Sequence, residues 1–249
     1  MKVVMTGGGT GGHIFPALAI ADEIRKNEVE SSIKFIGAKG KMEETLVPEN
    51  NYEIELIEVI GLNRKNMFKN INFIVKYFTS LYKCKTILKE FKPDVVIGTG
   101  GYVTGPVVSS AVKLGIPSII QEGNSYPGKV IKYLSAKVSR VIVNFEETKN
   151  YLKRKDNVVK ISYPVRSKIK SVTKEEALKF FNINNKSKTI FVFGGSQGSK
   201  AINEVLENNI EMLANENINI IWQTGKINYE KKKKKLNNIS EKIKIFGFI

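Results

Sequence analysis

The sequence predicts an α/β protein in which parallel strands alternate with covering helices. Short runs of β-branched and other apolar residues alternate with stretches whose apolar residues recur at helical spacing. Two glycine-rich turns, residues 7–13 and 98–106, each follow a β-branched run and lead into a helical stretch. The alternation restarts after residues 162–166, which look like a hinge and therefore indicate a second domain.

The first half of the chain alternates regularly between the two patterns. Strands are expected at residues 3–5, 33–36, 52–60, 95–97, 118–121 and 141–144. Helices are expected at residues 14–25, 67–90, 107–114 and 129–136, and Pro16 is tolerated in a first helical turn. This alternation predicts a parallel sheet covered by helices, in a first domain over residues 1–163.

The second domain, residues 164–249, repeats the pattern with fewer strands. Helices are expected at residues 174–181 and 200–215, and strands at 189–193, 218–222 and 243–248. The basic run 231–235 is typical of a solvated helix face. Since open α/β sheets more often hold about five or six strands, this domain is expected to be incomplete. Its last strand should then be an unpaired edge.

The charge of the chain is its unusual bulk property. Its 249 residues carry a formal net charge of +16, although 42% hydrophobic and 26% charged residues are ordinary for a soluble globular protein. The excess predicts an anionic partner: nucleic acid, a membrane surface or a phosphorylated substrate. A source organism rich in Lys and Asn is the alternative explanation. No aromatic–basic array typical of a nucleic-acid module is found, so no nucleic acid is expected.

The cysteine content suits a reducing cytoplasm, and the hydropathy predicts no membrane-spanning helix. The single cysteine, Cys84, excludes an intrachain disulfide. No apolar run reaches the roughly 18 residues of a spanning helix, and the first strand begins too early for a signal peptide. Any membrane contact is therefore expected to be peripheral. No cluster of His, Cys, Asp and Glu has the spacing of a metal site, so no metal or cofactor is expected.

The glycine-rich turns indicate diphosphate chemistry. A glycine turn between a strand and a helix aims backbone N–H groups and the positive helix end at an anion, and two such turns suggest two oxyanion contacts around one cleft. Gly7, Gly9 and Gly12 also satisfy the dinucleotide fingerprint. The next strand, however, ends without the carboxylate that would hold a ribose, which argues against NAD.

Three single residues each have two interpretations, one functional and one without a direct role in the chemistry. His13, the only histidine, is either a helix-terminal residue without chemistry or a neutral general base beside a phosphate-binding turn. Ser196 lies in a nucleophile-elbow pattern, but no histidine follows it, so a phosphate or hydroxyl contact is expected instead. Glu122, at a strand end, is either a substrate contact or a structural hydrogen bonder.

The helix predicted over residues 67–90 carries more large apolar residues than one packing stripe uses, and lysines surround them. This composition is typical of a helix at the interface of an anionic bilayer. The alternative is a bulky core helix with a charged outer face.

Six segments together resemble the MurG family of N-acetylglucosaminyltransferases. They occur in the family's order, cover nearly the whole chain, and are specific as a set although each alone is weak. They are Gly8-Gly9-Thr10-Gly11-Gly12-His13, Gly61-Leu62-Asn63-Arg64-Lys65, Gly98-Thr99-Gly100-Gly101-Tyr102-Val103, Glu122 with Asn124, Pro164-Val165-Arg166, and Gly194-Gly195-Ser196-Gln197-Gly198.

The resemblance implies a GT-B glycosyltransferase fold of two Rossmann-like domains and an inverting hexosyltransferase that needs no cofactor. The reaction moves N-acetylglucosamine from UDP-N-acetylglucosamine to the C4 hydroxyl of undecaprenyl-diphospho-N-acetylmuramoyl-pentapeptide, in peptidoglycan synthesis. The protein would lie peripherally on the cytoplasmic face of the cell membrane. Alternatives are another lipid-acceptor GT-B transferase, such as a diacylglycerol glycosyltransferase, and a non-catalytic, membrane-associated fragment.

The resemblance also implies roles for matched positions. His13 becomes the candidate base. The UDP-N-acetylglucosamine contacts are Thr10, Gly11, Gly12, Asn124, Arg166 and Ser196. The acceptor diphosphate faces Gly100, Gly101 and Tyr102, and the membrane patch comprises Ile71, Val75, Phe78 and Leu81.

The chain departs from the family pattern in three places. The usual His-Glu-Gln-Asn reads Gln121-Glu122-Gly123-Asn124, and the usual Asn before Pro-Val-Arg is Tyr163. The family also continues about a hundred residues further, with an acidic residue for the ribose and glutamines for the donor sugar. The chain is therefore expected to bind the donor poorly and to transfer little by itself.

Overall fold

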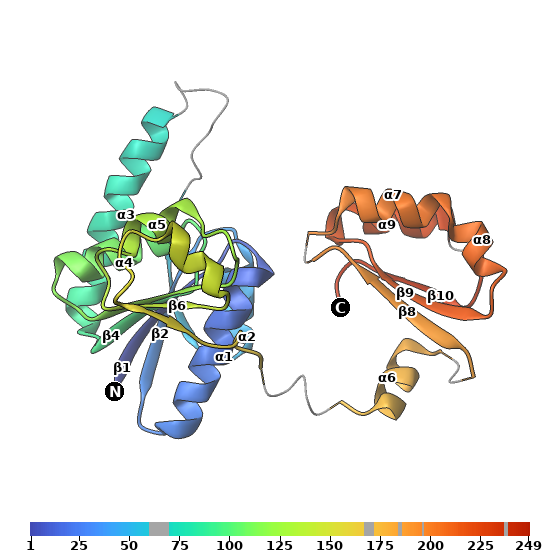
Figure 1. The fold of residues 1–249 in the computed structure, drawn as a ribbon, viewed down its shortest axis with the longest axis horizontal. Helices are drawn as coiled ribbons and strands as arrows, with labels where there is room; N and C mark the ends of the chain where they lie inside the picture. The colour runs from blue at the N-terminus through green and yellow to red at the C-terminus, as the bar shows by residue number, and fades with distance from the viewer. Residues whose placement is uncertain (60–69, 167–171, 184–185, 196, 237–238) are drawn as a thin grey trace. The chain divides into compact units, whose positions relative to one another are not determined.

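The chain folds into two compact units, Met1–Ser167 and Lys168–Ile249 (Figure 1). The computed structural model describes residues 1–249 apart from 60–69, 167–171, 184–185, 196 and 237–238, and it leaves out the side chains of 70–75 and 236. The division between the units lies four residues beyond the predicted one, at 167 rather than 163.

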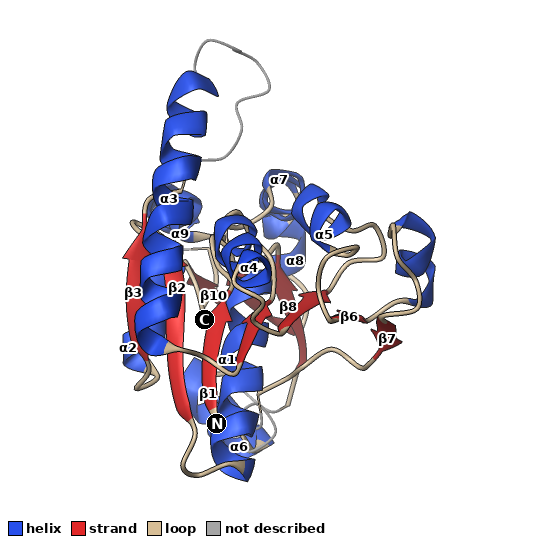
Figure 2. Cartoon of the chain, turned by 90° about the vertical axis from the view of Figure 1, so that its left-hand side faces the viewer, coloured by secondary structure: helices blue, strands red, loops and turns tan. Residues whose placement is uncertain are grey.

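In the described part of the first unit, seven strands form one parallel sheet in the order β3-β2-β1-β4-β5-β6-β7. Figure 2 shows β3, β2 and β1 as neighbouring arrows. The strands are β1 (Lys2–Thr6), β2 (Ser32–Ala38), β3 (Glu53–Ile57), β4 (Val95–Gly98), β5 (Ser118–Glu122), β6 (Arg140–Val143) and β7 (Val158–Lys160).

Helices cover both faces of this sheet because side chains alternate along each strand. Val3 and Met5 pack with α1 (Gly11–Asn27) and α2 (Met42–Glu49) on one face. Val4 points to the other face, where α3 (Asn70–Phe91), α4 (Thr104–Lys113) and α5 (Lys129–Leu134) contribute to a second buried cluster. A 3-10 helix, η2 (Glu146–Tyr151), follows β6.

The second unit has a smaller sheet. Its described strands, β8 (Lys188–Phe193), β9 (Ile218–Gln223) and β10 (Ile243–Phe246), are parallel in the order β10-β9-β8. Leu206, Ile210 and Trp222 belong to its buried core. β10 pairs only with β9 within the described residues, so it is an edge strand. The helices are α6 (Lys174–Phe181), α7 (Lys200–Asn208), α8 (Ile210–Ala214) and α9 (Lys226–Leu236), and α9 carries the basic run.

The structure differs from the predicted elements in several places. The short elements α2, η2 and β7 were not expected, because they have too few residues to show a clear hydrophobic period. The strand expected over residues 52–60 ends at Ile57. The helix expected over 200–215 is interrupted at Asn209, whose φ of −113° and ψ of 6° lie outside the helical region.

The only cysteine offers a test of this core. Cys84 lies on α3 with no exposed surface, and burial raises the pKa of its thiol to about 12 from an ordinary value of 9.0. In the folded chain at pH 8 it should therefore react with a thiol reagent only as fast as the first unit opens. Thiol labelling followed by mass spectrometry checks this, and labelling as fast as in urea would contradict it.

The same burial predicts a loss of stability in alkali. Above pH 9 the thiol ionises in the unfolded chain but stays protonated in the folded chain up to about pH 12. The free energy of unfolding should therefore fall across this window, by about 3 kcal/mol at pH 11 from this group. In Cys84→Ala this component is absent, so urea unfolding of both chains at pH 7 and pH 11 isolates it.

Candidate functional site

The two glycine turns of the first unit meet at the carboxyl ends of β1 and β4. These strands pair directly, with Thr6 beside Gly98. The sheet order runs from β1 to β2 and β3 on one side, and from β4 to β5, β6 and β7 on the other. The pair therefore forms the topological switch point, where open α/β sheets bind ligands. The sequence placed both turns correctly after strands but did not show that these strands are neighbours.

The turns are packed so closely that side chains are excluded between them. The Gly8 N–H donates to the Gly100 carbonyl over 3.3 Å. A Cβ at Gly101 would lie 2.3 Å from the Gly8 carbonyl oxygen, and a Cβ at Gly100 would lie 2.5 Å from Nδ1 of His13. Gly100 and Gly101 also have φ of +108° and +85°, a region that favours glycine. Both positions therefore require glycine.

His13 is held by the second turn. Its Nδ1 lies 3.1 Å from the carbonyl oxygen of Thr99, and the Thr99 hydroxyl donates to the His13 carbonyl over 2.7 Å. Because a carbonyl can only accept, this geometry places the imidazole proton on Nδ1. In the neutral imidazole, Nε2 then carries the lone pair with which a histidine removes a proton.

Two helices begin at these turns. α1 starts at Gly11, and the first N–H groups of a helix have no partner within it. α4 starts at Thr104, whose hydroxyl accepts from the Gly100 N–H over 3.2 Å and donates to the Gly100 carbonyl over 2.7 Å. In the described part of the chain, no hydrogen-bond acceptor meets the N–H groups of Gly101 and Tyr102. The helix starts therefore offer donors to an anion.

A buried carboxylate accepts a hydrogen bond from the backbone of the first glycine turn. Glu43 on α2 has no exposed surface, and its two oxygens accept from the Gly9 N–H over 2.8 Å and the Ala38 N–H over 3.0 Å. Glu43 was not predicted as a site residue from the sequence. The only signal was a glutamate in the first turn of a short helix whose hydrophobic pattern is weak.

The turn after β5 is shaped by Glu122. Its carboxylate accepts from the Asn124 backbone and side-chain N–H groups over 2.9 and 2.8 Å, and from the Gly128 N–H over 2.8 Å. These contacts favour the structural interpretation of Glu122. The Asn124 side-chain nitrogen is thereby engaged, whereas none of the described residues bonds its side-chain oxygen.

Arg166 lies away from the glycine turns. Its guanidinium contacts Asp22 at 3.0 Å and Asn50 at 2.7 Å, and Tyr52 donates to the same Asp22 over 2.9 Å. Burial, followed by the bond to Asp22, raises the pKa of Tyr52. Asp22 lies ten residues beyond Gly12 on α1, which is about 15 Å of helix. Arg166 is therefore not among the residues that the structure gathers at the turns, and Ser196 lies outside the described residues.

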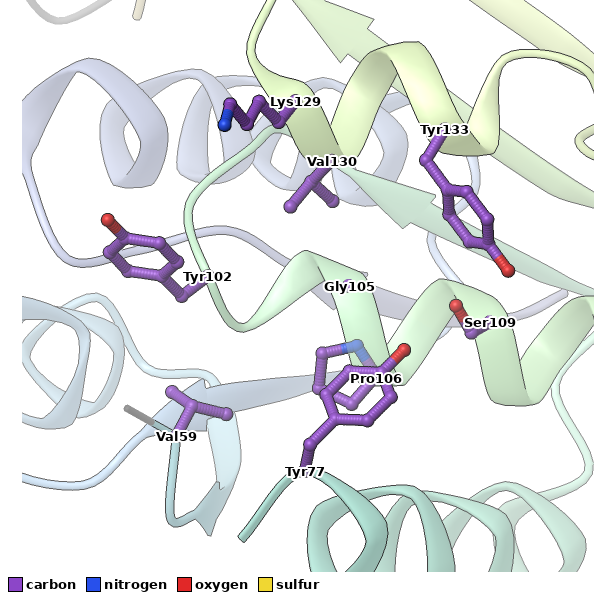
Figure 3. Close-up of a pocket in the computed structure, with 9 residues that line it drawn as sticks. All are labelled: Val59, Tyr77, Tyr102, Gly105, Pro106, Ser109, Lys129, Val130 and Tyr133. Atoms are coloured by element: carbon purple, nitrogen blue, oxygen red, sulfur yellow. The ribbon is translucent and has the colours of Figure 1, made fainter. Parts of the chain in front are cut away.

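An apolar pocket adjoins the second turn. Its volume is about 260 Å³, and Figure 3 shows Tyr77, Tyr102 and Tyr133 around the start of α4. Tyr102 belongs both to the second glycine turn and to the lining of the pocket. The remaining residues that line it are Val59, Gly105, Pro106, Ser109, Lys129 and Val130.

The predicted membrane patch can be followed only in part. Ile71 and Val75 lie on α3, but their side chains are not among those that the structure describes. Phe78 is 64% exposed, while Leu81 is half-buried. Tyr82, which the prediction did not include, is 76% exposed on the same helix. None of the helices in the described part of the chain is both long and apolar enough to cross a bilayer.

Comparison with protein families identifies the chain. Residues 3–143 match the glycosyltransferase family 28 N-terminal domain, and residues 189–249 match the glycosyltransferase family 28 C-terminal domain. The chain belongs to glycosyltransferase family 28. The resemblance to the MurG family is confirmed by the relatives described next.

Two relatives carry the name UDP-N-acetylglucosamine--N-acetylmuramyl-(pentapeptide) pyrophosphoryl-undecaprenol N-acetylglucosamine transferase. The protein of Thermoanaerobacter sp. (strain X514) is 42% identical over 254 residues, covering 100% of this chain and 69% of that protein. The protein of Christiangramia forsetii is 39% identical over 236 residues, covering 94% and 64%. The chain thus spans less than two thirds of the length of the latter relative.

Solved structures confirm the α/β GT-B fold. The crystal structure of Acinetobacter baumannii MurG is 27% identical with a TM-score of 0.67, over 100% of this chain and 68% of that one. A UDP-GlcNAc 2-epimerase from Neisseria meningitidis, bound to UDP-GlcNAc, is 17% identical with a TM-score of 0.67, over 99% and 72%. At that identity the epimerase shows a shared fold only.

The role of Glu43 can be tested by removing one acceptor. In Glu43→Gln, either the Gly9 or the Ala38 N–H would face an amide N–H group and lose its partner. We expect the free energy of unfolding to fall by about 1–3 kcal/mol, as measured by urea denaturation. The matched control is Glu44→Gln, one residue along, whose carboxylate accepts the Gly40 N–H at an exposed position. Equal stability of the two variants would contradict the prediction.

Proposed function

We propose that this chain transfers N-acetylglucosamine from UDP-N-acetylglucosamine to the C4 hydroxyl of a muramoyl sugar on an undecaprenyl diphosphate lipid, and that it does so slowly by itself, as the sequence predicts. The observation that carries the proposal is His13 beside two helix N-termini at the switch point of the first unit: its Nδ1 contacts Thr99, and no group in the described part of the chain bonds its Nε2. The names of the relatives at 39–42% identity support the choice of donor and acceptor. A diphosphate on each substrate suits a site built from helix starts.

In the proposed reaction, Nε2 of His13 accepts the proton of the acceptor C4 hydroxyl. The hydroxyl oxygen attacks C1 of the donor sugar on the face opposite UDP. The bond from C1 to the phosphate oxygen breaks, and its electron pair leaves with UDP. One displacement inverts the configuration at C1. The bond from His13 to Thr99 holds the imidazole in the tautomer that this step needs.

Negative charge builds on the departing UDP and must be stabilised. We assign Thr10, Gly11 and Gly12, at the start of α1, to this donor side, because helix-start N–H groups stabilise charge without reorganising. Asn124 is proposed for the donor sugar through its free side-chain oxygen. Arg166 and Ser196 are the remaining proposed donor contacts. Arg166 would have to exchange Asp22 and Asn50 for the diphosphate.

The acceptor is assigned to the start of α4. The free N–H groups of Gly101 and Tyr102 face its diphosphate in this proposal, whereas that of Gly100 is held by Thr104. The apolar pocket shared with Tyr102 then receives the first isoprene units of the lipid. A ligand with a charged head and an apolar chain matches a helix start that opens into an aromatic pocket.

The experiment compares the chain with His13→Asn, whose side-chain amide can still donate to the Thr99 carbonyl. Transfer is followed with labelled UDP-N-acetylglucosamine and the polyprenyl-diphosphoryl muramoyl-pentapeptide. The variant should bind the acceptor normally and transfer about 10²–10⁴-fold more slowly.

Other outcomes would overturn the proposal in different ways. Transfer by the variant at the unchanged rate would exclude His13 as the base. Acceptor binding without any transfer by the unmodified chain would favour the non-catalytic alternative. Transfer to diacylglycerol in place of the muramoyl lipid would favour a different lipid-acceptor transferase.

The same proposal places the chain peripherally on the cytoplasmic face of the cell membrane, with α3 against anionic lipid. In support, Phe78 and Tyr82 are exposed, and lysines flank them along the helix. A net charge of +16 adds electrostatic attraction to anionic headgroups.

The membrane contact can be tested with vesicles that contain anionic phospholipid. Phe78→Ser should weaken vesicle binding about tenfold, because an aromatic ring no longer enters the interface. Binding is measured by co-sedimentation at low and high salt. Phe180→Ser is the matched control, since Phe180 is 72% exposed but lies on α6 of the second unit. Equal weakening by both substitutions would contradict the assignment to α3.

A further inference from the structure

Tyr163 contacts the first turn of α1 at a carbonyl that the helix itself leaves free. Its hydroxyl donates to the Gly12 carbonyl over 3.0 Å. In a regular helix that carbonyl would accept from the N–H four residues further on. The residue there is Pro16, which has no N–H. The hydroxyl of Tyr163 therefore supplies the donor that Pro16 removes, next to His13.

The ring of Tyr163 lies against a second turn of the site. A Cβ at Gly123 would come 2.8 Å from Cε2 of this ring, closer than side-chain carbons approach. Gly123 stands between Glu122 and Asn124 in the turn after β5. The ring thus occupies the space that a side chain at position 123 would need. Two of the positions that depart from the family pattern, 123 and 163, therefore meet here.

We propose that Tyr163 is a positioning residue that couples the His13 turn to the turn bearing Glu122 and Asn124. It touches neither substrate in the proposed mechanism, and it acts through the backbone of Gly12 and the surface of Gly123. Its catalytic meaning rests on the proposed function, whereas the coupling itself does not. Burial and the nearby Glu122 raise the pKa of Tyr163, so its hydroxyl stays a donor at neutral pH.

The hydroxyl is tested by a double-mutant cycle with Pro16. Tyr163→Phe removes the donor to Gly12 and should raise the unfolding equilibrium constant about two- to tenfold. Pro16→Ala restores an N–H that can reach the same carbonyl. In the Pro16→Ala background, the added effect of Tyr163→Phe should therefore shrink toward zero. Tyr151→Phe, another exposed tyrosine, is the control and should show no such coupling.

The ring is tested by a second cycle with Gly123. Gly123→Gln alone should be destabilised, because its Cβ overlaps the ring of Tyr163. Adding Tyr163→Asn should restore most of the loss, although each substitution alone is harmful. Tyr151→Asn in the Gly123→Gln chain should restore nothing. Failure of Tyr163→Asn to restore stability would overturn the contact.

The positioning role needs a readout that stability alone does not give. His13 is the only histidine, so its imidazole nitrogens are unambiguous in NMR spectra. Tyr163→Phe should shift these signals toward a mixture of tautomers, and Pro16→Ala should reverse the shift. Unchanged imidazole signals in Tyr163→Phe would overturn the role. Because no transfer is measured, that result is independent of whether the proposed reaction is correct.

Discussion

The close approach of two glycine turns is the constraint on which the site depends. Pairing of β1 with β4 brings the turns to the same edge, and the absence of Cβ atoms lets Gly101 pack on the Gly8 carbonyl. The starts of α1 and α4 are consequently brought to one place. The same contact directs Nδ1 of His13 at the Thr99 carbonyl, and none of the described residues bonds Nε2. Backbone packing thus sets both the donors for an anion and the state of the base.

The buried carboxylate of Glu43 limits where an anion can lie. It takes the N–H of Gly9 and places negative charge behind the first turn. An anion bound to that N–H would displace the Glu43 carboxylate from its hydrogen bond. It would also lie at short range from a like charge. The remaining donors of this turn lie at the start of α1, at Gly11 and Gly12. The carboxylate therefore both rigidifies the turn and directs a diphosphate toward the helix start.

The sequence was sufficient for features that depend on neighbouring residues. Most strands and the long helices were predicted, because a β-branched run or a helical period can be recognised from consecutive residues. The glycines likewise indicated both turns. The residues that were missed act across the sheet. Glu43 reaches Gly9 over 34 positions, and Tyr163 reaches Gly12 over 151. No local pattern indicates such a contact, since its partners become neighbours only once the strand order is known.

The segment that precedes the second unit lies along α1, and this bears on Arg166. Tyr163 contacts the start of the helix, whereas Arg166 contacts Asp22 about 15 Å further along. Three extended residues span about 10 Å, and the long arginine side chain covers the rest. Arg166 can therefore reach a diphosphate at the helix start only by turning back toward Tyr163. Asp22 would keep its bond from Tyr52 when Arg166 leaves, so the exchange does not leave this half-buried carboxylate without a partner.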